Sequence, residues 1–155
     1  MSRTPTATEI MSAYIAALRA EATFSDYAVR RGPLQALRLG ARQTGIILVE
    51  LAGMDGAEES RGSGNVWTHD WALQVTLAVP DQYDDPDAAE TARLALLEAW
   101  LDWQGKIEQR SLATAKTGRI RSLECVLLSW PAETEQIYRA CIARVVYTSY
   151  NRRSE

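Results

Sequence analysis

The chain has 155 residues, a hydrophobic fraction of 46% and a charged fraction of 24%, which predicts one folded domain over 1–155 and excludes a wholly disordered chain. The formal net charge of −3 argues against general nucleic-acid binding, where a basic surface usually dominates. Two cysteines do not make a disulfide framework, and no apolar run approaches the roughly 18 residues of a membrane span. We therefore expect a chain without signal peptide or membrane contact, made in a reducing cytoplasm.

The first expected element is a helix over residues 7–22. Thr6 and Glu9 have the spacing of a capping box, in which each side chain satisfies a free backbone N–H at the start of a helix. A loose tail is expected at 1–5. Apolar residues then recur at helical spacing on one face: Ile10, Met11, Tyr14, Ile15 and Leu18.

Residues 23–33 interrupt this periodicity. Arg30 and Arg31 precede the pair Gly32-Pro33, which is typical of an exposed turn. We therefore predict a connection here, with the two arginines at the surface. The segment 34–40 is ambiguous and could form a short helical turn.

Two strands are expected next, over 44–51 and 66–79. The first is a β-branched apolar run between glycines, and the second alternates one strongly apolar face with one mixed face. Between them, 52–65 contains four glycines and an acidic set, which predicts a long mobile hairpin loop. The acidic residues of this loop are Asp55, Glu58 and Glu59.

A second helix is expected from Asp85-Pro86 to about Trp103. An aspartate before a proline is a favourable helix start, because the carboxylate caps free N–H groups and proline fits the first turn. Gly105 is predicted to end the helix. Its apolar stripe is expected to consist of Leu94, Leu97 and Leu101, with Trp103 directed away from it toward a partner.

Two further strands are expected at 120–130 and 137–150, after a polar connection at 107–118. A flexible tail follows at 151–155, with Arg152 and Arg153. The element order α-β-β-α-β-β predicts an α+β fold, with a mainly antiparallel sheet of about four strands and two main helices packed on one face.

Few residues suggest chemistry. His69 is the one histidine, and no cluster of histidines and cysteines accompanies it, so no catalytic residue, metal site or cofactor is predicted. Cys125 and Cys141 lie on strands joined by a short turn and could come near each other; we interpret them as small buried hydrophobes. The acidic corner at 81–87 could bind a divalent cation, but capping and solvation explain it more simply.

We interpret the remaining charged residues as candidates for contacts with other proteins. Acidic and basic groups on different parts of one subunit can form a head-to-tail contact that closes into a ring. Candidate interface residues are Arg30, Arg31, Asp55, Glu58, Glu59, Asp84, Asp85, Trp103, Arg152 and Arg153.

The pattern of elements resembles the tail terminator (tail-completion) proteins of tailed bacteriophages. The similarity lies in ILVEL (47–51), WALQVTLAV (71–79), DDPDAAETARLALLEAW (84–100) and IARVVYTSY (142–150). It covers 7–150 and includes no diagnostic motif, so no individual residue role is carried over.

The resemblance implies a structural protein, not an enzyme, assembled in the host cytoplasm and located at the head-proximal end of the virion tail. It implies a homo-oligomeric ring, commonly a hexamer, that caps the tail tube protein and joins it to the head-tail connector protein, with DNA only passing through. Two alternatives stay open: a head-completion or connector-adaptor protein, and a small-molecule-binding domain or enzyme using His69 and an acid such as Glu124.

Overall fold

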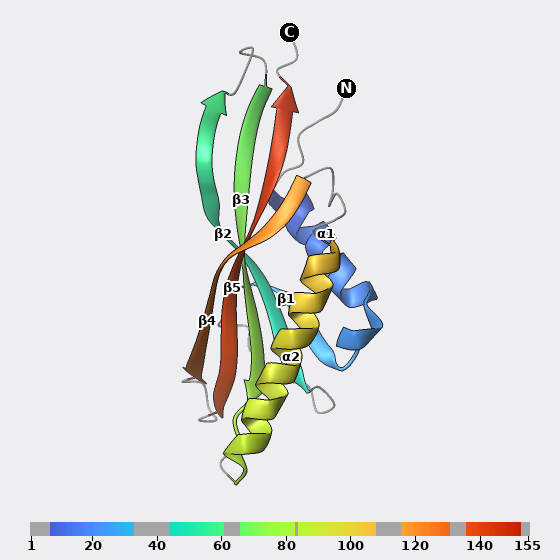
Figure 1. Cartoon of the computed structure of the whole chain (residues 1–155), viewed down its shortest axis with the longest axis vertical. Coiled ribbons are helices and arrows are strands. Elements are labelled where there is room, and N and C mark those ends of the chain that lie inside the picture. The colour runs from blue at the N-terminus through green and yellow to red at the C-terminus, as the bar shows by residue number, and fades with distance from the viewer. Residues whose placement is uncertain are drawn as a thin grey trace.

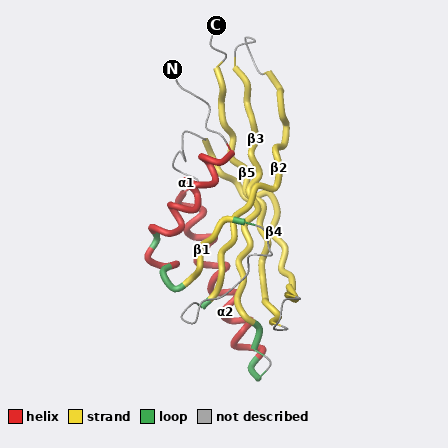
Figure 2. Tube along the Cα trace, turned by 180° about the vertical axis from the view of Figure 1, so that it is seen from behind, coloured by secondary structure: helices red, strands yellow, loops and turns green. Residues whose placement is uncertain are grey.

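The computed structural model describes residues 7–32, 44–60, 66–82, 84–107, 116–130 and 136–152. Two helices and a mostly antiparallel five-stranded sheet confirm the α+β class (Figure 1). The sheet order is β1-β2-β3-β5-β4, and the pair β1–β2 is parallel. Both helices lie on the same side of the sheet, as the view from behind also shows (Figure 2). The elements are α1 (Ala7–Ala20), η1 (Ala22–Phe24), β1 (Tyr27–Arg31), β2 (Gly45–Ser60), β3 (Val66–Pro80), α2 (Pro86–Ile107), β4 (Lys116–Trp130) and β5 (Gln136–Arg152).

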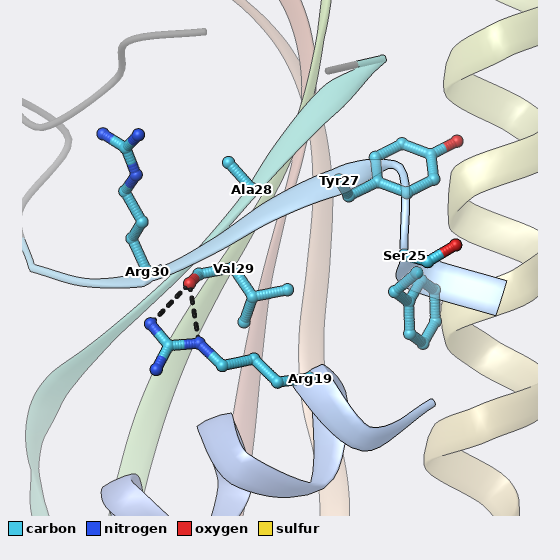
Figure 3. A pocket seen from close by; sticks show the side chains of 7 residues that line it. Arg19, Ser25, Tyr27, Ala28, Val29 and Arg30 are labelled. Atoms are coloured by element: carbon cyan, nitrogen blue, oxygen red, sulfur yellow. Dashed lines mark hydrogen bonds between the residues drawn. The ribbon is translucent and has the colours of Figure 1, made fainter. Parts of the chain in front are cut away.

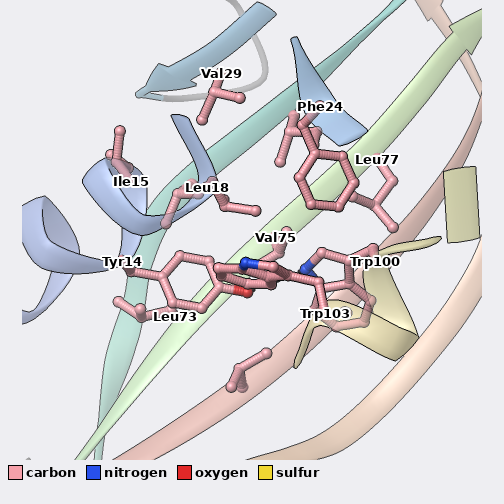
Figure 4. Packing of buried hydrophobic residues seen from close by; sticks show 14 of the residues in the cluster. Tyr14, Ile15, Leu18, Phe24, Val29, Leu73, Val75, Leu77, Trp100 and Trp103 are labelled. Atoms are coloured by element: carbon pink, nitrogen blue, oxygen red, sulfur yellow. Dashed lines mark hydrogen bonds between the residues drawn. The ribbon is translucent and has the colours of Figure 1, made fainter. Parts of the chain in front are cut away.

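The main core lies between the helices and one sheet face (Figure 4). Leu73, Val75, Leu77 and Val79 of β3 supply the odd-numbered face that the sequence pattern predicted, and all are buried. The apolar face of α1 is also as expected. Its five members are buried in the same cluster: Ile10, Met11, Tyr14, Ile15 and Leu18.

The opposite sheet face holds a second, smaller apolar cluster. It includes Ile46 and Leu48 of β2, Ala78 of β3, and Tyr138 and Ala140 of β5. Central strands buried on both faces explain why the sequence of β2 is nearly continuous in apolar residues.

β1 replaces part of the connection that was predicted at 23–33. Tyr27 to Arg31 pair in parallel with Gly45 to Val49, so Arg30 and Arg31 lie in an edge strand and not in a turn. The Arg19 guanidinium donates two hydrogen bonds to the Val29 carbonyl, through Nε at 3.1 Å and Nη2 at 2.8 Å. Tertiary pairing therefore makes a strand of five residues that have no regular alternation of their own.

β2 is longer than predicted, because most of the expected loop is strand, whereas β3 begins at Val66 as predicted. β2 continues to Ser60, and the ladder with β3 is irregular between Leu51 and Gly53 and between Asp55 and Glu59. Gly53 has a φ of 157°, a conformation that residues with a Cβ rarely adopt. The glycine therefore belongs to a bulge within the strand and not to a hairpin turn. The rest of the predicted loop, 61–65, is outside the described residues.

α2 differs from the prediction in its end and in its buried face. Gly105 lies inside the helix, which ends at Ile107. The buried face consists of Ala89, Leu96, Trp100, Trp103 and Gln104, whereas Leu94 and Leu101 are exposed. Leucines on both sides of the helix made the two faces hard to distinguish from the sequence.

The last two strands exceed their predicted bounds. β4 begins at Lys116, inside the expected polar connection, and β5 extends to Arg152, inside the expected tail. Residues 1–5, 34–40 and 153–155 lie outside the described part of the chain, so the predicted terminal tail at 1–5 and the helical turn at 34–40 are not addressed.

Candidate functional site

The end of the sheet formed by β2, β3 and β5 extends past both helices (Figures 1 and 2). Its backbone is a three-stranded ladder: Glu59 pairs with Thr68, and Thr68 pairs with Tyr150. Arg152 pairs with Val66 near the same end. The predicted interface positions Asp55, Glu58 and Glu59 of β2 are therefore brought to the same projecting end as Arg152, while Arg153 lies outside the described residues.

Arg30 and Arg31 form a basic group at an open sheet edge. Both are exposed, and β1 has β2 as its strand neighbour on one side only. An edge strand presents unpaired backbone groups to which another chain can be added. The two arginines therefore lie on this edge strand, in which the Val29 carbonyl is already bonded to Arg19.

The acidic corner at the start of α2 divides into structural and free carboxylates. Asp81 and Glu90 both accept hydrogen bonds from the Arg139 guanidinium, at 2.8 Å and 2.9 Å, which ties α2 to β5. Asp85 accepts a hydrogen bond from the Ala88 N–H at 3.1 Å and caps the helix, as predicted. Asp84, like Asp85, is exposed.

These ion pairs shift the pKa values of Glu90 and Arg139. The hydrogen bond from Arg93 to Glu90, at 2.6 Å, and the bond from Arg139 lower the pKa of the Glu90 carboxyl. The same arrangement raises the pKa of Arg139, through Asp81 first and Glu90 second. These charges hold the helix in place and are not arranged as an acid–base pair around a substrate.

Trp103 is not an interface residue. It is 8% exposed and packs edge-on against Tyr14 and Phe24, with ring centroids 5.2 Å and 6.1 Å away. The prediction that it faces a partner is wrong, because Trp103 lies on the buried face of α2. Of the predicted leucine stripe, Leu94 and Leu101 are exposed, whereas Leu97 packs against the core.

Several exposed apolar side chains were missed as interface candidates. Leu94 and Leu101 are 45% and 37% exposed on the outer face of α2, and Leu123 and Leu127 are 39% and 62% exposed on the edge strand β4. The spacing of seven residues between Leu94 and Leu101 predicts an apolar stripe on the helix, but it does not say whether that stripe faces the core or the surface. Exposed apolar groups of this size are typical of contact surfaces when they gather on one face.

His69 and Glu124 are far apart in the sheet. The backbone of His69 pairs with Ser149, whereas that of Glu124 pairs with Ile142, seven residues earlier on β5. This separation is roughly 23 Å along the strand, at about 3.3 Å per residue. The two residues therefore do not form the catalytic pair considered from the sequence.

The two cysteines meet across β4 and β5. Cys125 and Cys141 are paired in register, with Sγ atoms 3.3 Å apart. Cys141 is buried, as expected, but Cys125 is exposed. Burial raises the pKa of the Cys141 thiol to about 12, and the hydrogen bond with Cys125 acts in the same direction.

A depression of about 290 Å³ lies between the end of α1 and β1 (Figure 3). Its polar groups come from Arg19, Ser25, Tyr27 and Arg30, but the Arg19 donors Nε and Nη2 are already bonded to the Val29 carbonyl. Burial, followed by the charge of Asp26, raises the pKa of Tyr27. This depression shows no arrangement of nucleophile and base.

A buried chain of hydrogen bonds joins the helices to the sheet. The Tyr14 hydroxyl donates to Gln104 Oε1 at 2.7 Å and accepts from Trp100 Nε1 at 3.1 Å, and Gln104 Nε2 donates to the Tyr147 hydroxyl at 3.2 Å. Buried polar groups that satisfy one another in this way fix the packing of a core.

Among the described residues no group of histidine, cysteine, aspartate and glutamate could hold a metal ion. Neither described helix has the length and apolar character needed to cross a membrane. No protein-family model matches the chain, and no curated protein matches it in sequence.

Proposed function

We propose that the chain is a structural subunit that joins copies of itself head to tail into a ring at the end of a bacteriophage tail tube. The observation that carries this proposal is the separation of opposite charges on one subunit. Arg30 and Arg31 are exposed on the edge strand β1, whereas Asp84, Asp85 and Asp87 are exposed beyond the end of the central strand β3. A contact between two different surfaces repeats from copy to copy and closes when the rotation allows.

The projecting end of β2, β3 and β5 supports a second contact, with the tail tube. Its strands are long and extend past the helices, so another protein can approach them without displacing the core (Figure 1). The resemblance to tail terminators supports the same arrangement, in which the ring ends tube growth and joins the tail to the head connector.

The test is charge reversal and its rescue. Arg30→Glu with Arg31→Glu is expected to reduce self-association measured by light scattering, and Asp84→Lys with Asp87→Lys is expected to do the same. This acidic pair avoids Asp85, which caps α2, and Asp81, which binds Arg139. Mixing the two charge-reversed proteins restores a contact in which each subunit meets a partner of opposite sign.

Asp102→Lys is the matched control, because Asp102 is exposed near the other end of α2. It is expected to leave the assembly mass unchanged. Unaltered association in both charge-reversed proteins would reject this pair of surfaces. Binding to portal-bearing heads in place of tubes would instead identify a connector adaptor.

A further inference from the structure

We propose that Cys125 and Cys141 form a site of reversible oxidation, at which a small disulfide such as oxidised glutathione closes an intrachain bond between β4 and β5. The two residues are opposite each other in the ladder, and their Sγ atoms are 3.3 Å apart. The site is independent of the assembly proposal, because both thiols belong to one chain.

The backbone already has the separation that a disulfide needs. Directly opposed residues of an antiparallel pair have Cα atoms about 4.5–5.5 Å apart. Disulfides span Cα separations of about 4.4–6.8 Å. The bond therefore forms by small rotations of two side chains on the same sheet face, without movement of either strand.

The difference in exposure sets the order of the steps. Cys125 is exposed and reaches the oxidant, whereas Cys141 is buried. The Cys125 thiolate attacks one sulfur of glutathione disulfide, which forms a mixed disulfide and releases one glutathione thiolate. The Cys141 thiol then loses its proton and attacks Cys125 Sγ, which releases the second glutathione. Two protein thiols are oxidised, and one glutathione disulfide is reduced to two glutathione thiols.

The second step is expected to be the slow one. Attack requires the Cys141 thiolate, and burial holds the pKa of this thiol far above neutral pH. Closure should therefore accelerate with pH between 7 and 9, by up to about tenfold per unit, because the thiolate fraction of a thiol that titrates above this range rises in that proportion.

The consequence of closure is a fixed sheet edge. β4 has β5 as its strand neighbour on one side only, so the bond links the edge strand covalently to the interior of the sheet. It closes a short loop that includes the connection between the two strands, and such a constraint reduces the freedom of the unfolded chain. The melting temperature of the oxidised protein is expected to rise by several degrees.

The experiment incubates the folded full chain with oxidised glutathione and follows its mass. Wild type is expected to lose two hydrogen atoms, peptide mapping to join the Cys125 and Cys141 peptides, and dithiothreitol to reverse both changes. Cys141→Ala should stop at one glutathione adduct on Cys125, and Cys125→Ser should not react while folded. A folded wild type that stays reduced, or that keeps the adduct at pH 9, would overturn the proposal. Because the mapping needs no variant, a substitution that fails to fold leaves the test valid.

Discussion

Trp103 lies edge-on to Tyr14, with ring centroids 5.2 Å apart and an interplanar angle of 83°. This contact joins α2 to α1 within the core, so Trp103 stabilises the fold. Trp103→Ala is expected to destabilise the protein by about 3–5 kcal/mol, because a large aromatic side chain leaves a cavity. Chemical denaturation measures this loss.

Leu101→Ala is the control for that substitution, since Leu101 is exposed on the other face of α2. It should change stability by less than about 1 kcal/mol. If Trp103→Ala kept the stability of the wild type but lost self-association, Trp103 would be an interface residue and the core role described here would be wrong.

The hydrogen bonds of Tyr14 offer a sharper test of the core. Tyr14→Phe keeps the ring but removes the partner of Gln104 Oε1 and of Trp100 Nε1. We expect a loss of about 1–3 kcal/mol, the range for a buried polar group left without its partner. Thermal unfolding of Tyr14→Phe beside Tyr147→Phe measures it. A loss in Tyr147→Phe larger than that in Tyr14→Phe would contradict the central position given to Tyr14.

Substitution by alanine is expected to change the stability of the protein in opposite directions at two glycines. At Gly45 an added Cβ would lie 2.6 Å from the Ala78 carbonyl oxygen, so Gly45→Ala should cost about 1–3 kcal/mol. At Gly105 an added Cβ meets nothing within 4 Å, so Gly105→Ala should stabilise α2 by up to about 1 kcal/mol. Denaturation midpoints compare the pair directly. Equal effects of the two substitutions would contradict the described path of the backbone.

The contacts of Glu90 predict that the stability of the protein depends on pH. Its carboxyl pKa is lowered from the ordinary value of 4.5, by Arg93 first and also by Arg139. The stabilisation is therefore complete above pH 4.5 and is lost as pH falls through the lower folded-state pKa. The difference in melting temperature between wild type and Glu90→Gln should shrink over this acid range. Glu98→Gln, exposed on the same helix, should show no such change; a similar trend there would assign the effect to net charge.

The fold was predictable where one pattern had one explanation. Regular alternation specified β3, and helical spacing of apolar residues specified α1. α2 was harder, because Leu94 and Leu101 form one apolar stripe and Leu96, Trp100 and Trp103 form another. The choice between the two stripes depends on packing against α1 and the sheet, which no local pattern contains.

Two other differences from the prediction, the unexpected strand β1 and the shorter loop between β2 and β3, have a different cause. β1 exists through its pairing with β2, and its five residues lack a periodic signal. Glycines and acids in 52–60 indicated a loop, but the long partner strand β3 supplies a ladder and Gly53 supplies a bulge. Of the proposed interface residues, sequence reasoning could identify exposed charges such as Arg30 and Asp84. It could not identify which aromatic residue of α2 is buried.

The most direct measurement of the proposed role is electron microscopy of the purified chain mixed with tail tubes made from the tube protein of the same genome. We predict closed rings at one end of each tube, tubes that stop growing once capped, and free rings without tubes at high protein concentration. Bare tubes of unlimited length, beside a protein that stays monomeric at every concentration, would contradict the proposed function.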